Sequence, residues 1–256
     1  MPYAQHEGVR IHYAVEGSGP PLVLQHGFID SIGSWYEFGY VDGLRSDYRL
    51  ILVDARGHGA SDKPHEPASY AMEKRARDVL AVLDALGVGR THYLGYSMGG
   101  RIGFDLVAIA PHRLASLIIG GSHPYRLTAP DRHVVRTEGF AGGIAGWLAR
   151  GPWPDSVKTP GLMERILAND LEALIAMHVD RPDLAWMLER LTLPCLAYVG
   201  DADPARNRVE QFVAQLPQAS LVLLPGVDHG SGMVRSDLVL PHVRTFLERL
   251  PRDDAQ

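Results

Sequence analysis

The sequence predicts an α/β domain in which a mostly parallel sheet is covered by helices on both faces. Two observations support this prediction. Short runs of consecutive apolar residues recur along the chain, and most are followed by a segment whose apolar residues have helical spacing. Strands buried on both faces have such unbroken runs, and their alternation with helices is typical of parallel sheets. With 256 residues, 46% of them hydrophobic, the chain is long enough for one large domain with a substantial core.

The first half of the chain alternates regularly between predicted strands and helices. Residues 9–16 alternate apolar and polar side chains, which indicates a strand with one exposed face in an N-terminal hairpin. Helical spacing over residues 71–86 predicts a helix that Gly87 ends, and a short crossover helix is expected around residues 35–44. Buried strands are predicted at residues 22–25, 50–53, 91–94 and 117–119, with a helix through Ala110 after the third of them.

The alternation stops after Ser122 and resumes at Cys195. The intervening stretch contains two predicted helices, around residues 164–178 and 182–191, and the chain then continues with strands at 195–199 and 221–224 and helices at 207–216 and 238–250. Such an interruption is typical of an insertion over the carboxyl ends of the strands, where open α/β sheets bind ligands. We therefore expect a core formed by residues 1–122 and 191–256 and a helical cap formed by residues 123–190.

Composition and charge exclude several classes of partner. The net charge of −5 and the pI near 6.2 give no basic surface for nucleic acid, and no apolar run reaches the roughly 18 residues of a membrane span. The N-terminus lacks the features of a signal peptide, and the single cysteine, Cys195, lies in an apolar run where a buried thiol is expected. The expectation is a soluble cytoplasmic protein that acts on a small molecule; the sequence does not indicate whether it is a monomer or a homo-oligomer.

Residues 95–99 have the pattern G-x-S-x-G between a predicted strand and a predicted helix. In this context the pattern describes a nucleophile elbow, a tight turn that exposes the hydroxyl of Ser97. Its glycines let strand and helix approach, and the turn requires a strained backbone at the serine. Alone, the pattern is weak, because a chain of this composition shows it by chance about one time in ten. The alternative is a glycine-rich turn with a solvent-exposed serine.

Five features in register make the chain resemble an α/β-hydrolase-fold serine hydrolase of the carboxylesterase-like kind with a small cap. They are the His26-Gly27-Phe28 turn, residues 54–61, the elbow, residues 200–203, and the Asp228-His229 pair. The chain order Ser, Asp, His is the order expected of this fold. The resemblance implies a mostly parallel eight-stranded sheet with helices on both faces and a small helical cap, and an enzyme without a cofactor.

Three residues are the predicted catalytic groups. Ser97 is the nucleophile, and it needs a base because a serine hydroxyl is a poor nucleophile by itself. Of twelve histidines, His229 is the best placed, in a glycine-flanked loop after the last predicted strand. The family usually places its acid three residues after the glycine that ends the late strand, which favours Asp203 over Asp201. Asp228 is interpreted as a loop residue, because its side chain would tend to point away from the neighbouring ring.

The resemblance also implies two backbone donors for an oxyanion, the N–H groups of Met98 and Phe28. The loop that contains Phe28 has one glycine, unlike the H-G-G-G loop of some lipases and esterases, which disfavours that subfamily. His26 and His58 lie in turns similar to those of the family and are interpreted as structural residues. Aromatic and methionine side chains of the cap and its neighbourhood are either pocket or core, and the candidates for the pocket are Trp35, Tyr125, Trp147, Trp153, Met177 and Trp186.

The expected activity is hydrolysis of a carboxylic ester of a small or medium, mostly apolar substrate through an acyl-enzyme. A lactonase, a carbon–carbon bond hydrolase and a cofactor-free haloperoxidase-like enzyme use the same triad and remain open. Serine at position 97 argues against relatives that use aspartate for dehalogenation or epoxide opening. No metal-binding or nucleotide-binding motif is present, so no metal is expected. Two alternatives of another class are a small-molecule receptor with weak hydrolase activity and a scaffold with a vestigial site.

Overall fold

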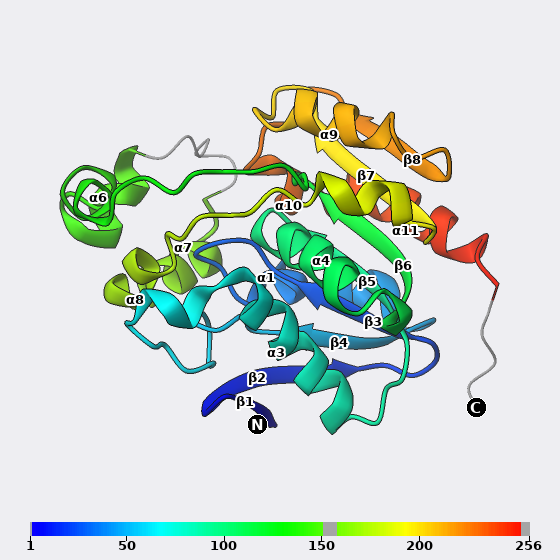
Figure 1. Cartoon of the computed structure of the whole chain (residues 1–256), viewed down its shortest axis with the longest axis horizontal. Coiled ribbons are helices and arrows are strands. Elements are labelled where there is room, and N and C mark those ends of the chain that lie inside the picture. Colours follow the sequence, from blue (N-terminus) through cyan, green and yellow to red (C-terminus); the bar gives the residue numbers. More distant parts are fainter. Residues whose placement is uncertain (1, 151–157, 252–256) are drawn as a thin grey trace.

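One eight-stranded sheet organises the computed structural model, which describes residues 2–150 and 158–251 (Figure 1). The strand order is β1-β2-β4-β3-β5-β6-β7-β8; β2 is antiparallel to both β1 and β4, and all other neighbours are parallel. This confirms the predicted fold. The strands are β1 (Tyr3–His6), β2 (Val9–Glu16), β3 (Pro21–Gln25), β4 (Arg49–Val53), β5 (Thr91–Tyr96), β6 (Leu114–Gly120), β7 (Cys195–Gly200) and β8 (Ala219–Leu224).

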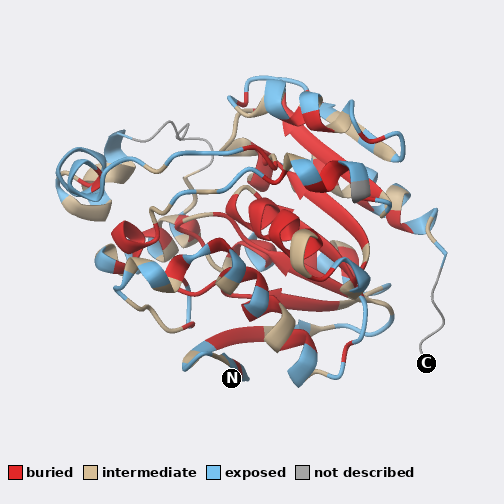
Figure 2. Cartoon of the chain, viewed as in Figure 1, coloured by how far each residue is buried: buried red, intermediate tan, exposed pale blue. Residues whose placement is uncertain are grey.

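The central strands have unbroken apolar sequences because both of their faces are buried (Figure 2). Successive side chains of β3 alternate between two cores: Val23 packs on one side of the sheet, and Leu22 and Leu24 pack on the other. Cys195 is completely buried in β7, and burial raises the pKa of its thiol to about 12. The edge strand β8 is half-exposed, as expected for a strand with one free side.

Helices α3, α4 and α9 cover one face of the sheet, and α1, α2 and α11 cover the other (Figure 1). The crossover expected as one short helix is two helices, because Gly39 adopts a left-handed conformation (φ 77°) between them. The bounds are α1 (Gly33–Glu37), α2 (Tyr40–Leu44), α3 (Met72–Ala85), α4 (Met98–Ile109), α9 (Arg206–Val213), α10 (Ser231–Val234) and α11 (Ser236–Glu248), with short 3₁₀ helices at Pro67–Tyr70 and Pro111–Arg113.

The segment between β6 and β7 contains short helices and, among its described residues, no strand. The helix expected at residues 164–178 is two helices, because the side chain of Asp170 caps a new helix by accepting from the N–H of Ala173. The helix expected at 182–191 is a 3₁₀ helix, and α6 was not predicted because its sequence is rich in Gly and Ala. The bounds are α5 (Arg132–Val134), a π-helical turn (Val135–Gly139), α6 (Gly143–Arg150), α7 (Pro160–Leu167), α8 (Leu171–Ala176) and the 3₁₀ helix Ala185–Arg190.

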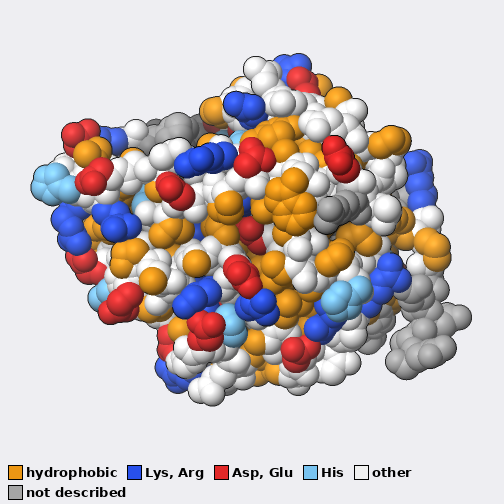
Figure 3. Space-filling model, viewed as in Figure 1, with side chains coloured by type: hydrophobic (Ala, Val, Ile, Leu, Met, Phe, Trp, Pro, Cys, Tyr) orange, Lys and Arg blue, Asp and Glu red, His pale blue; other side chains and the backbone are white. Residues whose placement is uncertain are grey.

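The outer surface has a mixed character. On the face seen in Figure 3, acidic and basic side chains are interspersed with apolar ones. Within residues 2–150 and 158–251, no helix has the length and apolar character that crossing a membrane requires.

Candidate active site

Ser97 occupies a strained turn between β5 and α4. Its backbone has φ 52° and ψ −107°, a region that residues other than glycine rarely adopt. A Cβ atom on Gly95 would lie 2.4 Å from the carbonyl oxygen of Gly99, and one on Gly99 would lie 2.1 Å from the carbonyl oxygen of Gln25. Both glycines are therefore required for close approach of backbone to backbone, and the turn has the geometry that the G-x-S-x-G pattern predicts.

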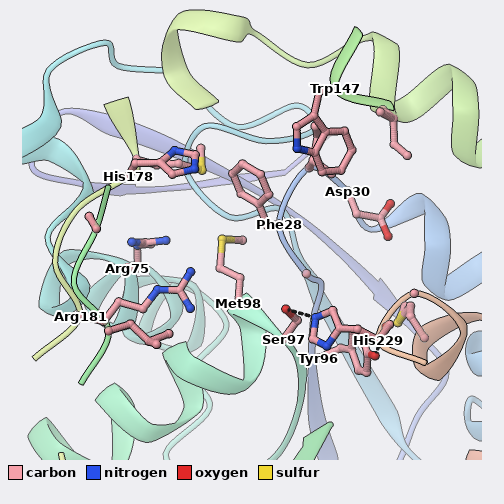
Figure 4. A pocket seen from close by; sticks show the side chains of 18 of the residues that line it. Phe28, Asp30, Arg75, Tyr96, Ser97, Met98, Trp147, His178, Arg181 and His229 are labelled. Atoms are coloured by element: carbon pink, nitrogen blue, oxygen red, sulfur yellow. Dashed lines mark hydrogen bonds between the residues drawn. The ribbon is translucent and has the colours of Figure 1, made fainter. Parts of the chain in front are cut away.

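The side chains of Ser97, His229 and Asp203 form one hydrogen-bonded chain. His229 Nε2 lies 2.8 Å from Ser97 Oγ (Figure 4), and His229 Nδ1 lies 2.8 Å from Asp203 Oδ2. Because an ionised carboxylate only accepts hydrogen bonds, Nδ1 carries the proton and Nε2 is free to accept from the serine hydroxyl. The Asp203 side chain is 1% exposed, and its second oxygen accepts from the N–H of Ala205 at 2.7 Å.

The two other aspartates of these loops have different partners. Asp201 Oδ1 accepts from the N–H of Gly226 at 2.8 Å, and Asp228 Oδ1 accepts from the N–H of Ser231 at 2.7 Å. Both bonds shape the loops and leave the ring of His229 to Asp203. The sequence-based preference for Asp203 and the interpretation of Asp228 as a loop residue agree with these contacts.

Tyr96 supports His229 and was missed by the sequence analysis. Its hydroxyl donates to the backbone carbonyl of His229, and the two rings pack with their centroids 5.5 Å apart. Burial raises the pKa of Tyr96 well above its ordinary value, so the hydroxyl stays protonated and remains a donor. Tyr96 occupies a variable position of the G-x-S-x-G pattern, so the pattern gave no indication of this role.

The loop after β3 lies directly beside the serine. A Cβ atom on Gly27 would lie 3.6 Å from the Cβ of Ser97, so the backbone of Phe28 runs close to the elbow. The next residue, Ile29, has φ 65°, which is strained for a β-branched side chain. Its N–H donates to Nε2 of His58 at 3.1 Å, and its carbonyl accepts from the side chain of Asn169 at 2.9 Å. These two hydrogen bonds fix the position of the loop.

His26 and His58 have the structural contacts that the sequence analysis predicted. His26 Nε2 accepts from the N–H of Ala55 at 3.1 Å, which joins the loop after β3 to the loop after β4. Burial lowers the pKa of His58 well below its ordinary value. The ring is therefore neutral, which is the state that can accept from Ile29.

A cavity of about 470 Å³ opens above Ser97 and His229. Phe28 and Met98 line it, as expected if their backbones face the reacting group, and so do Trp147 and Met177 of the predicted pocket. Most other lining side chains are apolar. They include Ile29, Phe38, Leu127, Leu162, Ile166, Val179, Met233 and Val234.

The other pocket candidates do not line this cavity. Trp35 is completely buried in the core, and its ring packs edge-to-face with that of Tyr40 at a centroid distance of 4.9 Å. Tyr125 belongs to the opposite core, where its hydroxyl accepts from Gln215 at 2.8 Å. Trp186 is 52% exposed and borders a separate surface hollow. These three predictions were wrong, because helical spacing of aromatic residues does not distinguish core, surface and cavity; Trp153 lies outside the described residues.

Polar residues of the cavity were also missed by the sequence analysis. Asp30, Arg75, His178 and Arg181 line it. Arg75 carried a signal: it lies one helical turn from Met72 and Val79 on the apolar stripe of α3, where a charged residue is unusual. Within the part of the chain that the structure describes, no group of three or more His, Cys, Asp or Glu side chains is placed to hold a metal ion.

Comparisons with known proteins agree with this architecture. Three solved structures are similar over nearly the whole chain. A hydrolase from Pseudomonas aeruginosa PA01 has 27% sequence identity and a TM-score of 0.82, covering 96% of this chain and 97% of its own. The enol-lactonase from Burkholderia xenovorans LB400 has 25% identity and a TM-score of 0.84, covering 97% and 100%. The esterase RhEst1 from Rhodococcus sp. ECU1013 has 25% identity and a TM-score of 0.82, covering 97% and 98%.

The family model described as the alpha/beta hydrolase fold matches residues 20–152, which extend from β3 through the elbow into the segment after β6. More than half of the chain is thus matched, and the strand order and the turn at Ser97 are consistent with the match. The chain belongs to the alpha/beta hydrolase fold family.

Proposed function

We propose that this protein hydrolyses a carboxylic ester of a small or medium substrate, with Ser97 as nucleophile, His229 as general base and Asp203 as the orienting acid. The observation that carries the proposal is the chain of two 2.8 Å hydrogen bonds from Ser97 through His229 to Asp203 beside the cavity. Nucleophile, base and orienting group within hydrogen-bond reach are the arrangement that acyl transfer requires.

In the proposed mechanism, His229 Nε2 takes the proton of Ser97 as Oγ attacks the ester carbonyl. Asp203 stabilises the imidazolium by accepting from Nδ1, and the same ring then protonates the leaving alcohol. Water activated by His229 hydrolyses the acyl-enzyme and releases the acid. The backbone N–H groups of Phe28 and Met98 donate to the oxyanion, and the proximity of Gly27 to Ser97 supports this assignment.

The segment of residues 123–190 acts as the cap of this site in the proposal. It contributes Trp147, Met177 and their neighbours to the cavity wall, while the sheet and the elbow contribute the floor. A cavity of about 470 Å³ suits a small or medium substrate, and its largely apolar lining suits hydrocarbon portions on either side of the ester.

A lactone is the second candidate substrate. The enol-lactonase from Burkholderia xenovorans LB400 is similar over 97% of this chain. A lactone is a cyclic ester, so the same nucleophile, base and oxyanion donors would open it, and the released alcohol would stay attached to the acyl group.

Hydrolysis of 4-nitrophenyl esters of increasing acyl length tests the proposal, with lactone opening followed in parallel by pH-stat titration. We expect measurable kcat/KM for the wild type and its loss in Ser97→Ala. Asp201→Asn is the matched control, because Asp201 lies two residues from Asp203 and its carboxylate accepts from the backbone N–H of Gly226. Turnover that survives in Ser97→Ala, or absence of turnover with both esters and lactones, contradicts the proposal.

A further inference from the structure

Two arginines face the cavity at a distance from the elbow; Arg75 is buried and Arg181 is partly buried. Arg75 comes from α3 and Arg181 from the segment before β7, and both line the cavity. In Figure 4 their guanidinium groups lie near each other, on the side of the Met98 side chain opposite to Ser97. The proposed reaction at Ser97 uses neither of them.

Other buried arginines of the same protein have structural partners. Arg56 donates to both carboxylate oxygens of Asp78 at 2.6 Å. Arg101 donates to the carbonyl oxygens of Pro124 and Pro182 and so ties the inserted segment to α4. In these two residues the guanidinium group stabilises the fold by donating hydrogen bonds to backbone or carboxylate oxygens.

Among the described residues, Arg75 and Arg181 have no partners of this kind. The contact of the Arg75 guanidinium is the sulfur of Met72 at 3.1 Å, and its Nε is buried without a hydrogen-bond partner among the described residues. No hydrogen bond or ion pair joins the Arg181 guanidinium to a side chain or carbonyl in residues 2–150 and 158–251. Arg75 is buried and Arg181 is partly shielded from solvent. A shielded charge without a partner is costly, so a compensating group is expected.

The nearby protein charges do not compensate the pair. Asp105 is the carboxylate whose charge acts on Arg75, Arg101 and Arg181, and it lies 3.5 Å from Nε of Arg101. Burial lowers the pKa of Arg75 to about 9, and the charge of Arg181 acts in the same direction. Arg75 is therefore still a cation at neutral pH. Asp105 is shared by three guanidinium groups, and the charge of Asp183 acts on Arg101.

The two arginines are held in position by the fold. The backbone of Arg181 pairs with that of Leu127, with N–H to carbonyl distances of 3.1 Å and 2.9 Å. Arg75 projects from a helix that packs on α4 and on the sheet. Because both come from backbone held by these contacts, presenting the pair to a ligand requires no rearrangement of the backbone.

We propose that Arg75 and Arg181 form a subsite for a carboxylate group, so that the substrate is an ester or lactone that carries a second, ionised carboxyl group. This inference rests on the proposed function of Ser97. A carboxylate has two oxygens and one negative charge, and guanidinium groups bind it through charge-assisted hydrogen bonds. The apolar walls between the pair and Ser97 accommodate the carbon chain that joins the two groups.

Matched pairs of esters test the subsite. With the charge on the acyl side, mono-4-nitrophenyl adipate is compared with 4-nitrophenyl 6-oxoheptanoate; with the charge on the alcohol side, 4-acetoxybenzoate is compared with 4-acetoxyacetophenone. In each pair a methyl ketone replaces the carboxylate at nearly constant size. We expect the anion to have at least about tenfold higher kcat/KM in one pair, as one charge-assisted bond suggests.

Variants separate the subsite from the catalytic groups. Arg181→Gln and Arg75→Met are expected to lower the anion-to-ketone ratio of kcat/KM at least about tenfold, mainly through KM, while ketone turnover changes less than about threefold. Arg181→Lys keeps the charge and is expected to retain part of the ratio. Arg136→Gln is the control, because Arg136 is an exposed arginine of the same segment, paired with Glu172; its ratio should equal that of the wild type.

The two proposals can fail separately. A ratio near one in both pairs, or a ratio that the arginine variants leave unchanged while ketone turnover still requires Ser97, overturns the subsite and leaves the hydrolase.

If neither ester is turned over, calorimetry of benzoate binding to wild type and Arg181→Gln decides the subsite alone. If the arginine variants do not fold, inhibition of the wild type decides: benzoate should inhibit ketone-ester hydrolysis at least about tenfold better than acetophenone. Stronger arginine-dependent inhibition by phenyl phosphate than by benzoate would overturn the choice of carboxylate.

Discussion

Substitution of Gly99 by alanine tests whether the elbow depends on contact between α4 and the end of β3. The added Cβ would lie 2.1 Å from the carbonyl oxygen of Gln25, 2.7 Å from its carbonyl carbon and 2.8 Å from the carbonyl oxygen of His26. All three atoms are backbone, so no side chain can rotate away. The start of α4 must move by about 1 Å from the strand, and overpacking of this kind costs about 1–3 kcal/mol.

The same movement displaces Ser97 from His229. A misplacement of about 1 Å can reduce the rate about 100-fold. We expect Gly99→Ala to lower the free energy of unfolding, measured by urea denaturation, by about 3 kcal/mol and kcat for a 4-nitrophenyl ester about 100-fold.

Gly89→Ala is the matched control. Gly89 is exposed before β5, its φ is not positive, and a Cβ there meets nothing within 4 Å. The control should leave kcat unchanged and stability equal or slightly higher, because alanine restricts the unfolded chain. Wild-type stability and activity in Gly99→Ala would refute the account of the elbow.

Three further predictions concern Asp203, Tyr96 and His123. Asp203→Asn should lower kcat about 10⁴-fold, because an amide favours the wrong tautomer of the histidine, whereas Asp201→Asn should change kcat less than about threefold; steady-state kinetics of both decides between the two acids. Tyr96→Phe removes the donor to the His229 carbonyl and should lower kcat about tenfold with little change in KM, and unchanged kcat would contradict this support. Burial lowers the pKa of His123 to about 4, so the folded state resists its protonation and stability is lost as pH falls from about 6.5 towards 4. When the pH is lowered from 7.5 to 5, the free energy of unfolding should fall by about 1 kcal/mol less in His123→Gln than in the wild type, a value reduced for the partial exposure of His123. Equal decreases in the two proteins, measured by urea denaturation, would contradict this prediction.

Local sequence was sufficient for the sheet and the elbow. The apolar runs of the central strands reflect burial on both faces, and the glycines at 95 and 99 are short-range requirements of one turn. The strands and the turn depend on residues close in the chain, so sequence patterns capture them. The preference for Asp203 over Asp201 came instead from the family resemblance, and the two aspartates have separate partners.

The cavity wall depends on contacts between distant segments, and sequence patterns captured it only in part. Trp35 and Trp147 have equal aromatic character, yet one is packed in the core and the other lines the cavity. Arg181 reaches the cavity because its backbone pairs with Leu127, more than fifty residues earlier, and no local pattern predicts that pairing. Arg75 was detectable, since a charge on the buried stripe of α3 is an inconsistency that calls for a reason.

The central claim is that His229 activates Ser97, and reaction with diethyl 4-nitrophenyl phosphate tests it most directly. The measurement is the rate of release of 4-nitrophenol together with peptide mass mapping of the modified residue. We predict one diethylphosphoryl group per chain, on Ser97, with a rate at least about 10³-fold slower in His229→Ala. Modification of another residue, or equal rates in wild type and His229→Ala, would contradict the claim.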